Sequence, residues 1–158
     1  MTARLNLFGS PLAGKVFARI GGASKAVFDS GLIPKATQDL VLLRVSQING
    51  CAYCTDVHSK DLLHAGESAE RVSLVAVWRE ATVFTDAERA ALELAEHGTR
   101  IADGAGGVPD EVWDNAAKHY DEEQLTALVC LISLINASNR LGVITRQQGG
   151  HYKPGTLG

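Results

Sequence analysis

The sequence predicts an all-α fold, a single-domain helical bundle of about six to eight helices over residues 1–158. Two observations lead to this prediction. Apolar residues recur with helical spacing in most segments and helix-capping signals precede several of them, whereas no segment alternates like a β-strand. The chain has 158 residues, 46% of them hydrophobic, so it can bury a core without a disulfide scaffold. We expect the packed core within 10–146 and an irregular tail over 147–158.

The expected helices are separated by glycine, proline or capping residues. Thr85 and Glu88 have the spacing of a capping box, in which each side chain satisfies a backbone N–H of the other residue. The pair Gly21-Gly22 weakens the first helix, so two short helices are an alternative there. In order, the expected helices are 11–29, 34–48, 51–65, one opened by Ser68 that carries Trp78, one opened by Thr85, 109–120, and one from Asp121 to about Thr145.

The charge pattern argues against several kinds of partner. The net charge is −3 and the 15 lysines and arginines are scattered, so no basic face for nucleic acid or for a membrane surface is expected. The longest apolar stretch, 125–137, is too short to span a bilayer and is expected to be a core helix. Residues 1–15 lack the pattern of a secretory signal. Three cysteines without such a signal predict the reducing environment of the cytoplasm.

Chemistry is concentrated at Cys51, Cys54 and His58, which stand at positions i, i+3 and i+7 and project from one face of the expected helix. The two thiols are close enough for a disulfide within one turn. The helix start stabilises a negative sulfur, and His58 can take the thiol proton as a general base. Such surroundings lower a thiol pKa from about 8.5 to roughly 3.5–7.5. Asp39, a lone acid on an apolar helix, is the expected carboxylate that orients the imidazole.

Other interpretations of these residues remain open. The spacing of Cys51, Cys54 and His58 is also half of a zinc site, but His64 points to another side and no second CxxC exists. Proximity to His58 favours Cys54 as the attacking thiol, whereas the helix start favours Cys51. Cys130 lies in an apolar run and is expected to be an inert core thiol.

Four segments carry a resemblance to a known family. Residues 39–58 read DLVLLRVSQINGCAYCTDVH, and three further segments agree: 84–92 (FTDAERAAL), 108–113 (VPDEVW) and 134–140 (LINASNR). Over roughly 10–146, the chain resembles the alkylhydroperoxidase D-like branch of the carboxymuconolactone decarboxylase-like superfamily. The acid, the CxxC pair and the histidine all fall at the family's spacing.

The resemblance implies an alkylhydroperoxidase D-like helical subunit that forms a homotrimer or homohexamer and reduces hydroperoxides without a cofactor. By position, Cys54 would be the thiol activated by His58, Cys51 its disulfide partner, and Asp39 the acid end of a proton relay. Asp39 stands where the family usually has Glu, and Tyr53 stands where the best-characterised peroxidases have His. The decarboxylase branch does not use a CxxC, so the cysteine pair argues against that reaction.

The leading hypothesis is therefore a thiol peroxidase that cycles through a Cys51–Cys54 disulfide and is reduced again by a lipoyl-type or thioredoxin-like dithiol. A second hypothesis is a non-catalytic helical oligomer whose CxxC senses redox state or binds a metal. A third is a carboxymuconolactone decarboxylase-like lyase, or an isomerase, with idle cysteines. Apolar positions on several sides of 34–48 and 125–145 favour a homo-oligomer.

Overall fold

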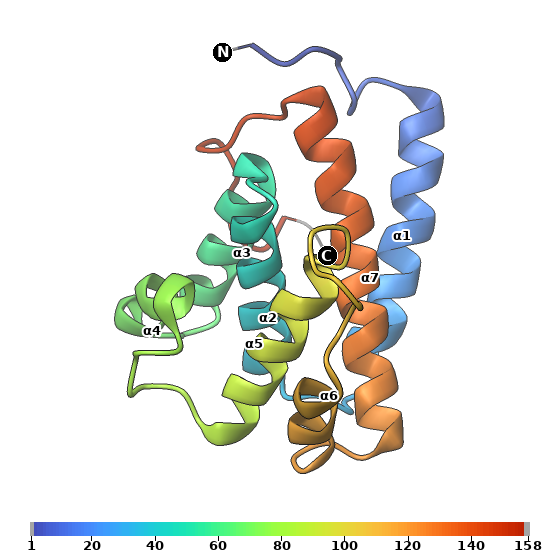
Figure 1. Cartoon of the computed structure of the whole chain (residues 1–158). Coiled ribbons are helices and arrows are strands. Elements are labelled where there is room, and N and C mark those ends of the chain that lie inside the picture. The colour runs from blue at the N-terminus through green and yellow to red at the C-terminus, as the bar shows by residue number, and fades with distance from the viewer. Residues whose placement is uncertain (1, 157–158) are drawn as a thin grey trace.

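The computed structural model describes residues 2–156, which form a bundle of helices with no β-strand among them (Figure 1). The predicted all-α fold is confirmed. Residues 147–156 form no helix, as predicted for the tail, and residues 1, 157 and 158 lie outside the described part of the chain. The helices are α1 (Pro11–Asp29), α2 (Lys35–Ile48), α3 (Ala52–His64), α4 (Ala69–Leu74), α5 (Asp86–Thr99), α6 (Asp110–Ala117) and α7 (Glu122–Thr145), with a 3-10 turn at Val75–Val77.

One detail of the expected helices is wrong, and one open alternative is decided. Helix α1 spans Pro11–Asp29 as predicted and runs without a break through Gly21-Gly22, so the alternative of two short helices is not observed. Packing along α7 compensates for the low helix propensity of glycine. The helix opened by Ser68 ends at Leu74 and continues as the 3-10 turn, so Trp78 lies beyond it. The tighter turn brings both Val75 and Trp78 into the core.

Helix α2 lies at the centre of the bundle, between α3, α5 and α7. Nine of its residues are buried, as its almost uniformly apolar sequence predicts. On one side, Val41 and Val45 join the main apolar core with α5, α6 and α7. On the other side, Leu40 and Leu43 join a second cluster with Leu62 of α3 and the segment around Trp78. Helix α3 is therefore fixed in place by its packing against α2.

Helix α7 is long and apolar enough to cross a membrane, judged by length and composition alone. It runs the length of the bundle beside α1 (Figure 1). Nine of its residues are buried against the other helices, including Leu128, Leu131 and Asn139, which are almost completely inaccessible. The other helices of the bundle thus cover the apolar face of α7, as expected for a core helix.

Cys130 corrects the sequence-based prediction of a core thiol, because the structure places it on the exposed face of α7. The buried positions of α7 recur at Leu128, Leu131, Ile132 and Ile135, with the period of a helix. Cys130 and its neighbour Val129 fall on the opposite side. An apolar run in a long helix does not by itself identify which of its residues face inward.

A buried carboxylate links three segments of the bundle. Glu96 of α5 accepts hydrogen bonds from Arg44 of α2, from the indole N–H of Trp78 at 2.9 Å, and from Arg79. Burial alone would raise the pKa of Glu96, but these hydrogen bonds together outweigh it and hold the pKa below its ordinary value of 4.5. Its charge is thus compensated inside the fold.

We predict that Glu96→Gln lowers the free energy of unfolding by about 3 kcal/mol near neutral pH, because it leaves Arg44 without a charged partner in the interior. The folded-state pKa of Glu96 is depressed, so its stabilising contribution is present above pH 4.5 and is lost as pH falls through the folded pKa. Urea denaturation from pH 3 to pH 7 measures this. The difference between wild type and variant should shrink in acid, whereas the exposed Glu80→Gln should change stability by less than about 0.5 kcal/mol throughout.

Candidate thiol site

The site begins at the turn between α2 and α3. Asn49 ends α2, and Gly50 follows with φ of 67°, a left-handed conformation that glycine adopts at little cost. Cys51 then becomes the N-cap residue of α3, and its N–H donates to the carbonyl of Ser46 at 3.0 Å. The predicted end of one helix at residue 48 and the predicted start of the next helix near Cys51 are both confirmed.

Cys51 and Cys54 form a disulfide across the first turn of α3, with their Cα atoms 5.3 Å apart. The backbone N–H of Cys54 also donates to the Cys51 sulfur at 3.3 Å, so this sulfur takes the place of a capping side chain. Both residues are buried, Cys51 with 1% of its surface exposed and Cys54 with 7%. The helix start and the pairing are as the spacing predicted, and Cys54 is the more accessible of the two.

A network of amide side chains holds the turn against α7. The Asn49 side-chain amide donates to the side-chain oxygens of Asn136 and Asn139, both at 2.9 Å. Asn139, which is fully buried, donates in turn to the hydroxyl of Ser46 at 3.2 Å. Buried amides are costly unless they are paired, so this network fixes the relative position of α2 and α7 directly beneath the cysteine pair.

Gly142 of α7 gives the disulfide its space. A Cβ atom built on Gly142 would lie 2.9 Å from the sulfur of Cys51 and 3.7 Å from that of Cys54. The first distance is below any normal carbon–sulfur contact, so a side chain at this position would displace the disulfide or α7. Nothing in the sequence distinguishes Gly142, since a glycine inside a helix gives no sign of what it contacts.

His58 lies on α3 one turn beyond Cys54 and is partly buried. Burial lowers the pKa of His58 from 6.5 to about 4; the carboxylate of Asp61 opposes this shift, and the ammonium of Lys35 adds to it. Near neutral pH the imidazole is therefore uncharged and able to accept a proton.

Asp39 is buried on α2, and its carboxylate accepts a hydrogen bond from Lys35 Nζ at 2.7 Å. Burial raises the pKa of Asp39, although the bond to Lys35 and its charge act in the opposite direction, and Asp61 raises the pKa further. Asp61 and Lys35 thus influence the pKa of both Asp39 and His58. The predicted partnership of Asp39 with His58 remains a prediction, since the hydrogen bond that Asp39 forms goes to Lys35.

Cys51, Cys54 and His58 lie in the first two turns of α3, and the zinc interpretation gains no additional ligand. Within the described residues, no three His, Cys, Asp or Glu side chains are grouped so that they could hold a metal ion. Lys35 and Asp61 were missed as neighbours of the site. Their positions four residues before Asp39 and three after His58 were the available signal, because such spacings share a helix face.

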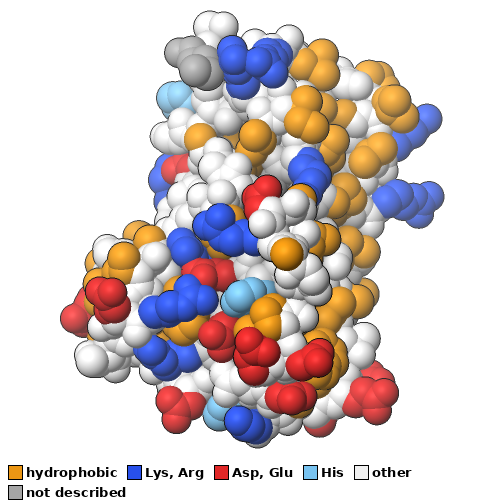
Figure 2. Space-filling model, viewed as in Figure 1, with side chains coloured by type: hydrophobic (Ala, Val, Ile, Leu, Met, Phe, Trp, Pro, Cys, Tyr) orange, Lys and Arg blue, Asp and Glu red, His pale blue; other side chains and the backbone are white. Residues whose placement is uncertain are grey.

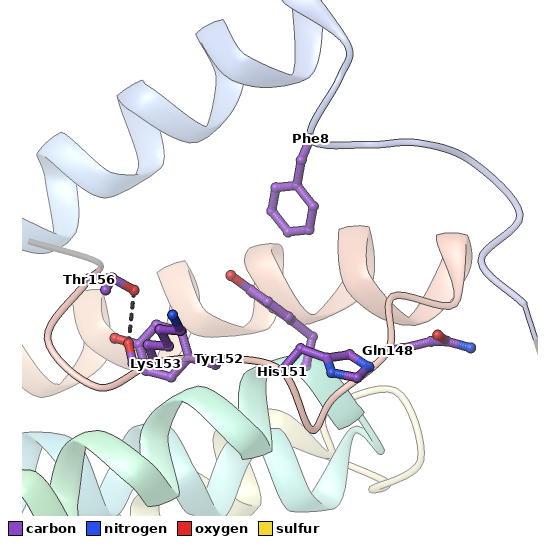
Figure 3. Close-up of a pocket in the computed structure, with 7 residues that line it drawn as sticks. Phe8, Gln148, His151, Tyr152, Lys153 and Thr156 are labelled. Atoms are coloured by element: carbon purple, nitrogen blue, oxygen red, sulfur yellow. Dashed lines mark hydrogen bonds between the residues drawn. The ribbon is translucent and has the colours of Figure 1, made fainter.

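A hollow of about 350 Å³ opens beside the start of α3. The ring of Phe8 lies 5.2 Å from that of Tyr53, the residue between the two cysteines, and Phe8 points toward the C-terminal segment (Figure 3). Tyr53 belongs to the CxxC turn, but the residues that line the hollow include neither of the two cysteines nor His58. The residues that line it are Phe8, Tyr53, Gln148, His151, Tyr152, Lys153 and Thr156.

Comparison with known proteins agrees with this arrangement. Residues 11–97, which contain the CxxC turn and His58, match the carboxymuconolactone decarboxylase family. The chain belongs to this family. Two bacterial members are similar in sequence and are themselves uncharacterised. YdfG of Bacillus subtilis (strain 168) is 42% identical over 70% of this chain and 74% of its own length, and YnjA of Escherichia coli (strain K12) is 35% identical over 65% of this chain and 55% of its own.

Solved structures extend the likeness of this family member to almost the whole chain. A protein of unknown function from Agrobacterium tumefaciens, described as a candidate antioxidant defence protein AhpD, has a TM-score of 0.86 and 34% identity and covers 96% of this chain and 100% of its own. The debrominase Bmp8 shares the fold with a TM-score of 0.73 and 21% identity, covering 85% of this chain and 70% of its own. The predicted AhpD-like fold is thereby confirmed.

We predict that Gly142→Ala lowers the free energy of unfolding of the disulfide form by about 1–3 kcal/mol, since its methyl group would overpack the Cys51 sulfur. Gly22→Ala is the matched control, because nothing lies within 4 Å of its added Cβ. That variant should stabilise the protein by about 0.5–1 kcal/mol through helix propensity. Urea denaturation measures both. Equal stabilisation by the two alanines would show that α7 does not pack against the disulfide.

Proposed function

We propose that the protein is a thiol peroxidase of the AhpD type, which reduces hydroperoxides through a cycle of the Cys51–Cys54 disulfide. The observation that supports it most is a buried, redox-competent cysteine pair at a helix N-terminus, with an uncharged imidazole one turn away. An idle pair would need none of these features. The helix dipole favours thiolate, and the imidazole provides a place for the proton.

Cys54 is the attacking thiol in this proposal, because it is more accessible than Cys51 and stands four residues before His58. Its proton passes to the imidazole of His58, and Asp39 is the acid that the family resemblance assigns to this relay. The thiolate attacks one oxygen of the hydroperoxide and the O–O bond breaks. The products are a sulfenic acid on Cys54 and an alcohol, which receives the proton from His58.

Cys51 completes the cycle. Its sulfur lies within bonding distance of Cys54 and displaces the hydroxyl of the sulfenic acid as water, which forms the disulfide. A dithiol of the lipoyl or thioredoxin kind then reduces the disulfide by exchange and becomes a disulfide itself. In sum, one hydroperoxide and one dithiol give one alcohol, one water and one disulfide.

The fold does not select the substrate, because Bmp8, which shares it, is a debrominase. The hollow next to Tyr53 favours a small organic hydroperoxide with an apolar group, since aromatic rings line part of it. A non-catalytic redox sensor would keep the disulfide but would have no need for a proton acceptor beside it. The cytoplasm suits this chemistry, because dithiol reductants maintain thiols there.

A homotrimer or homohexamer is part of the same proposal. Hydrophobic side chains gather along the edge formed by α1 and α7 (Figure 2). No residue of α1 is buried in the single chain, and Leu12 and Ile144 are 72% and 65% exposed. Such an extended apolar band is larger than the scattered apolar side chains of a monomer and is typical of a surface that other subunits cover.

Loss of either cysteine should abolish turnover, for different reasons. We expect Cys54→Ser to abolish consumption of cumene hydroperoxide with dihydrolipoamide, because the nucleophile is gone. We expect Cys51→Ser to react once and stop as a Cys54 sulfenic acid, which dimedone labels and mass spectrometry detects. The control is Cys130→Ser, whose thiol is exposed on α7 and is no part of the disulfide. Full activity in Cys54→Ser, or no peroxide turnover by wild type with any dithiol, would refute the peroxidase.

Light scattering at micromolar concentration should give a mass of about three or six times 16.8 kDa. We expect Leu12→Glu with Ile144→Glu to reduce this mass to that of one chain, because buried unpaired charges destabilise an apolar interface. Glu80→Gln, on another exposed surface, should leave the mass unchanged. A wild-type mass near 16.8 kDa would contradict the oligomer without affecting the thiol chemistry.

A further inference from the structure

The C-terminal segment, residues 147–156, is bound along α3 by several polar contacts. Asp56 accepts the backbone N–H groups of Gly150, at 2.7 Å, and of Tyr152, at 3.1 Å. Lys60 donates to the carbonyl of Tyr152 at 3.0 Å. These contacts span more than 90 positions of sequence and attach an irregular segment to the helix that carries the cysteines and His58.

Asp61 is the point where this segment is closest to the chemistry. Its carboxylate oxygens both lie 2.9 Å from the hydroxyl of Tyr152, and one also accepts the N–H of Gly155 at 3.0 Å. Hydrogen bonds to a carboxylate favour its charged form and restrict its orientation. The C-terminal segment therefore holds a negative charge at a fixed place on α3.

This charge lies on the His58 side of the helix. Asp61 is three residues after His58, a spacing at which side chains on a helix are neighbours. Asp39, the other nearby carboxylate, is already paired with Lys35 at 2.7 Å. Lys35, the partner of Asp39, itself lowers the pKa of His58, whereas the hydrogen bonds that Asp61 accepts within residues 2–156 come from neutral groups of Tyr152 and Gly155.

We propose that Asp61, held by Tyr152 of the C-terminal segment, is a positioning residue whose carboxylate stabilises His58 in its protonated form. The inference rests on the proposed function, in which His58 receives the Cys54 proton. In that step the S–H bond breaks, an N–H bond forms on the imidazole, and no electrons are exchanged. The segment thereby becomes part of the thiol site, although none of its residues stands near the CxxC in sequence.

The charges around His58 support this assignment. Burial lowers the pKa of His58, Asp61 is the group that opposes the shift, and Lys35 reinforces it. On α2 the charged group that acts on His58 is Lys35, which is paired with Asp39, and on α3 it is Asp61. Asp56 and Lys60 of α3 form an ion pair with each other. Charged groups on the other helices that pack on α3 bond elsewhere: Arg71 of α4 pairs with Glu67 and Glu88, and Arg140 of α7 bonds Asn136.

The test follows the reactivity of Cys54 against pH in a chain with Cys51→Ser and Cys130→Ser, where Cys54 is the sole cysteine. We expect Asp61→Asn to raise the apparent thiol pKa by about 0.5–1, so that alkylation by iodoacetamide below that pKa slows about three- to tenfold. The reason is that the imidazole loses its counter-charge. The rate on the alkaline plateau should stay the same, because the thiolate itself is unaltered. Asparagine keeps an oxygen acceptor, so the C-terminal segment should stay bound.

Three further variants separate the charge from other effects. Asp61→Glu should keep the wild-type profile, because it keeps the charge. Tyr152→Phe should shift the thiol pKa in the same direction as Asp61→Asn but less. Asp56→Asn is the matched control, since it neutralises a carboxylate on the same helix that contacts the same segment but stands two residues before His58, off its face. Circular dichroism and urea denaturation confirm that each variant is folded.

Several outcomes would overturn the inference. A lower thiol pKa in Asp61→Asn would mean that the carboxylate acts on the sulfur directly, by repulsion. If Asp61→Asn left the pH profile unchanged and Asp39→Asn raised the thiol pKa, Asp39 would be the acid that acts on His58. The inference about Asp61 would then be wrong, and the proposed function would be unaffected. When His58 is already replaced by alanine, Asp61→Asn should not change the thiol pKa any further, and a double-mutant cycle measures this. An additional shift there would show that Asp61 does not act through His58. If His58→Ala itself left the profile unchanged, the proton transfer in the proposed function would fail, and the role of Asp61 with it.

Discussion

The thiol site depends on the sharp turn between α2 and α3. Gly50 takes a positive φ there, which lets α3 begin directly after α2 and makes Cys51 its N-cap residue. Asn49 beside it is tied to Asn136 and Asn139, so a buried polar network is satisfied only when α7 lies beneath the turn. The place of the cysteines is therefore set by backbone conformation and polar burial, before any property of the sulfurs is considered.

The same turn gives the two sulfurs different environments. Cys51 is enclosed between the first turn of α3 and the bare backbone of Gly142, whereas Cys54 lies nearer the surface, on the side of His58. Burial raises a thiol pKa and a helix N-terminus lowers it, so these effects oppose each other more strongly at the deeper sulfur. This difference in exposure agrees with the proposed roles, in which Cys54 attacks the incoming hydroperoxide and Cys51 reacts with Cys54.

Local signals in the sequence predicted a large part of this structure. The capping residues Ser68, Thr85 and Asp121 mark helix starts, because a cap depends only on residues three positions apart. The spacing of the CxxC and histidine was readable for the same reason. The exposure of Cys130 was not, since it depends on how α7 is rotated against its neighbours. The docking of residues 147–156 onto α3 depends on contacts across most of the chain, and irregular segments carry no periodicity that would reveal a partner.

The proton affinity of His58 should follow the redox state of the cysteines. With the disulfide formed, burial keeps the imidazole neutral down to a pH of about 4. In the proposed cycle, transfer of a proton from Cys54 to His58 after reduction gives a thiolate and an imidazolium, and the two opposite charges stabilise each other. The imidazole of His58 is thus a weak base in the disulfide form and a stronger base in the reduced form, where the thiolate provides an opposite charge. In the same proposed cycle, the thiolate charge disappears when the sulfur forms a bond to oxygen, and the imidazolium then gives its proton to the departing alkoxide.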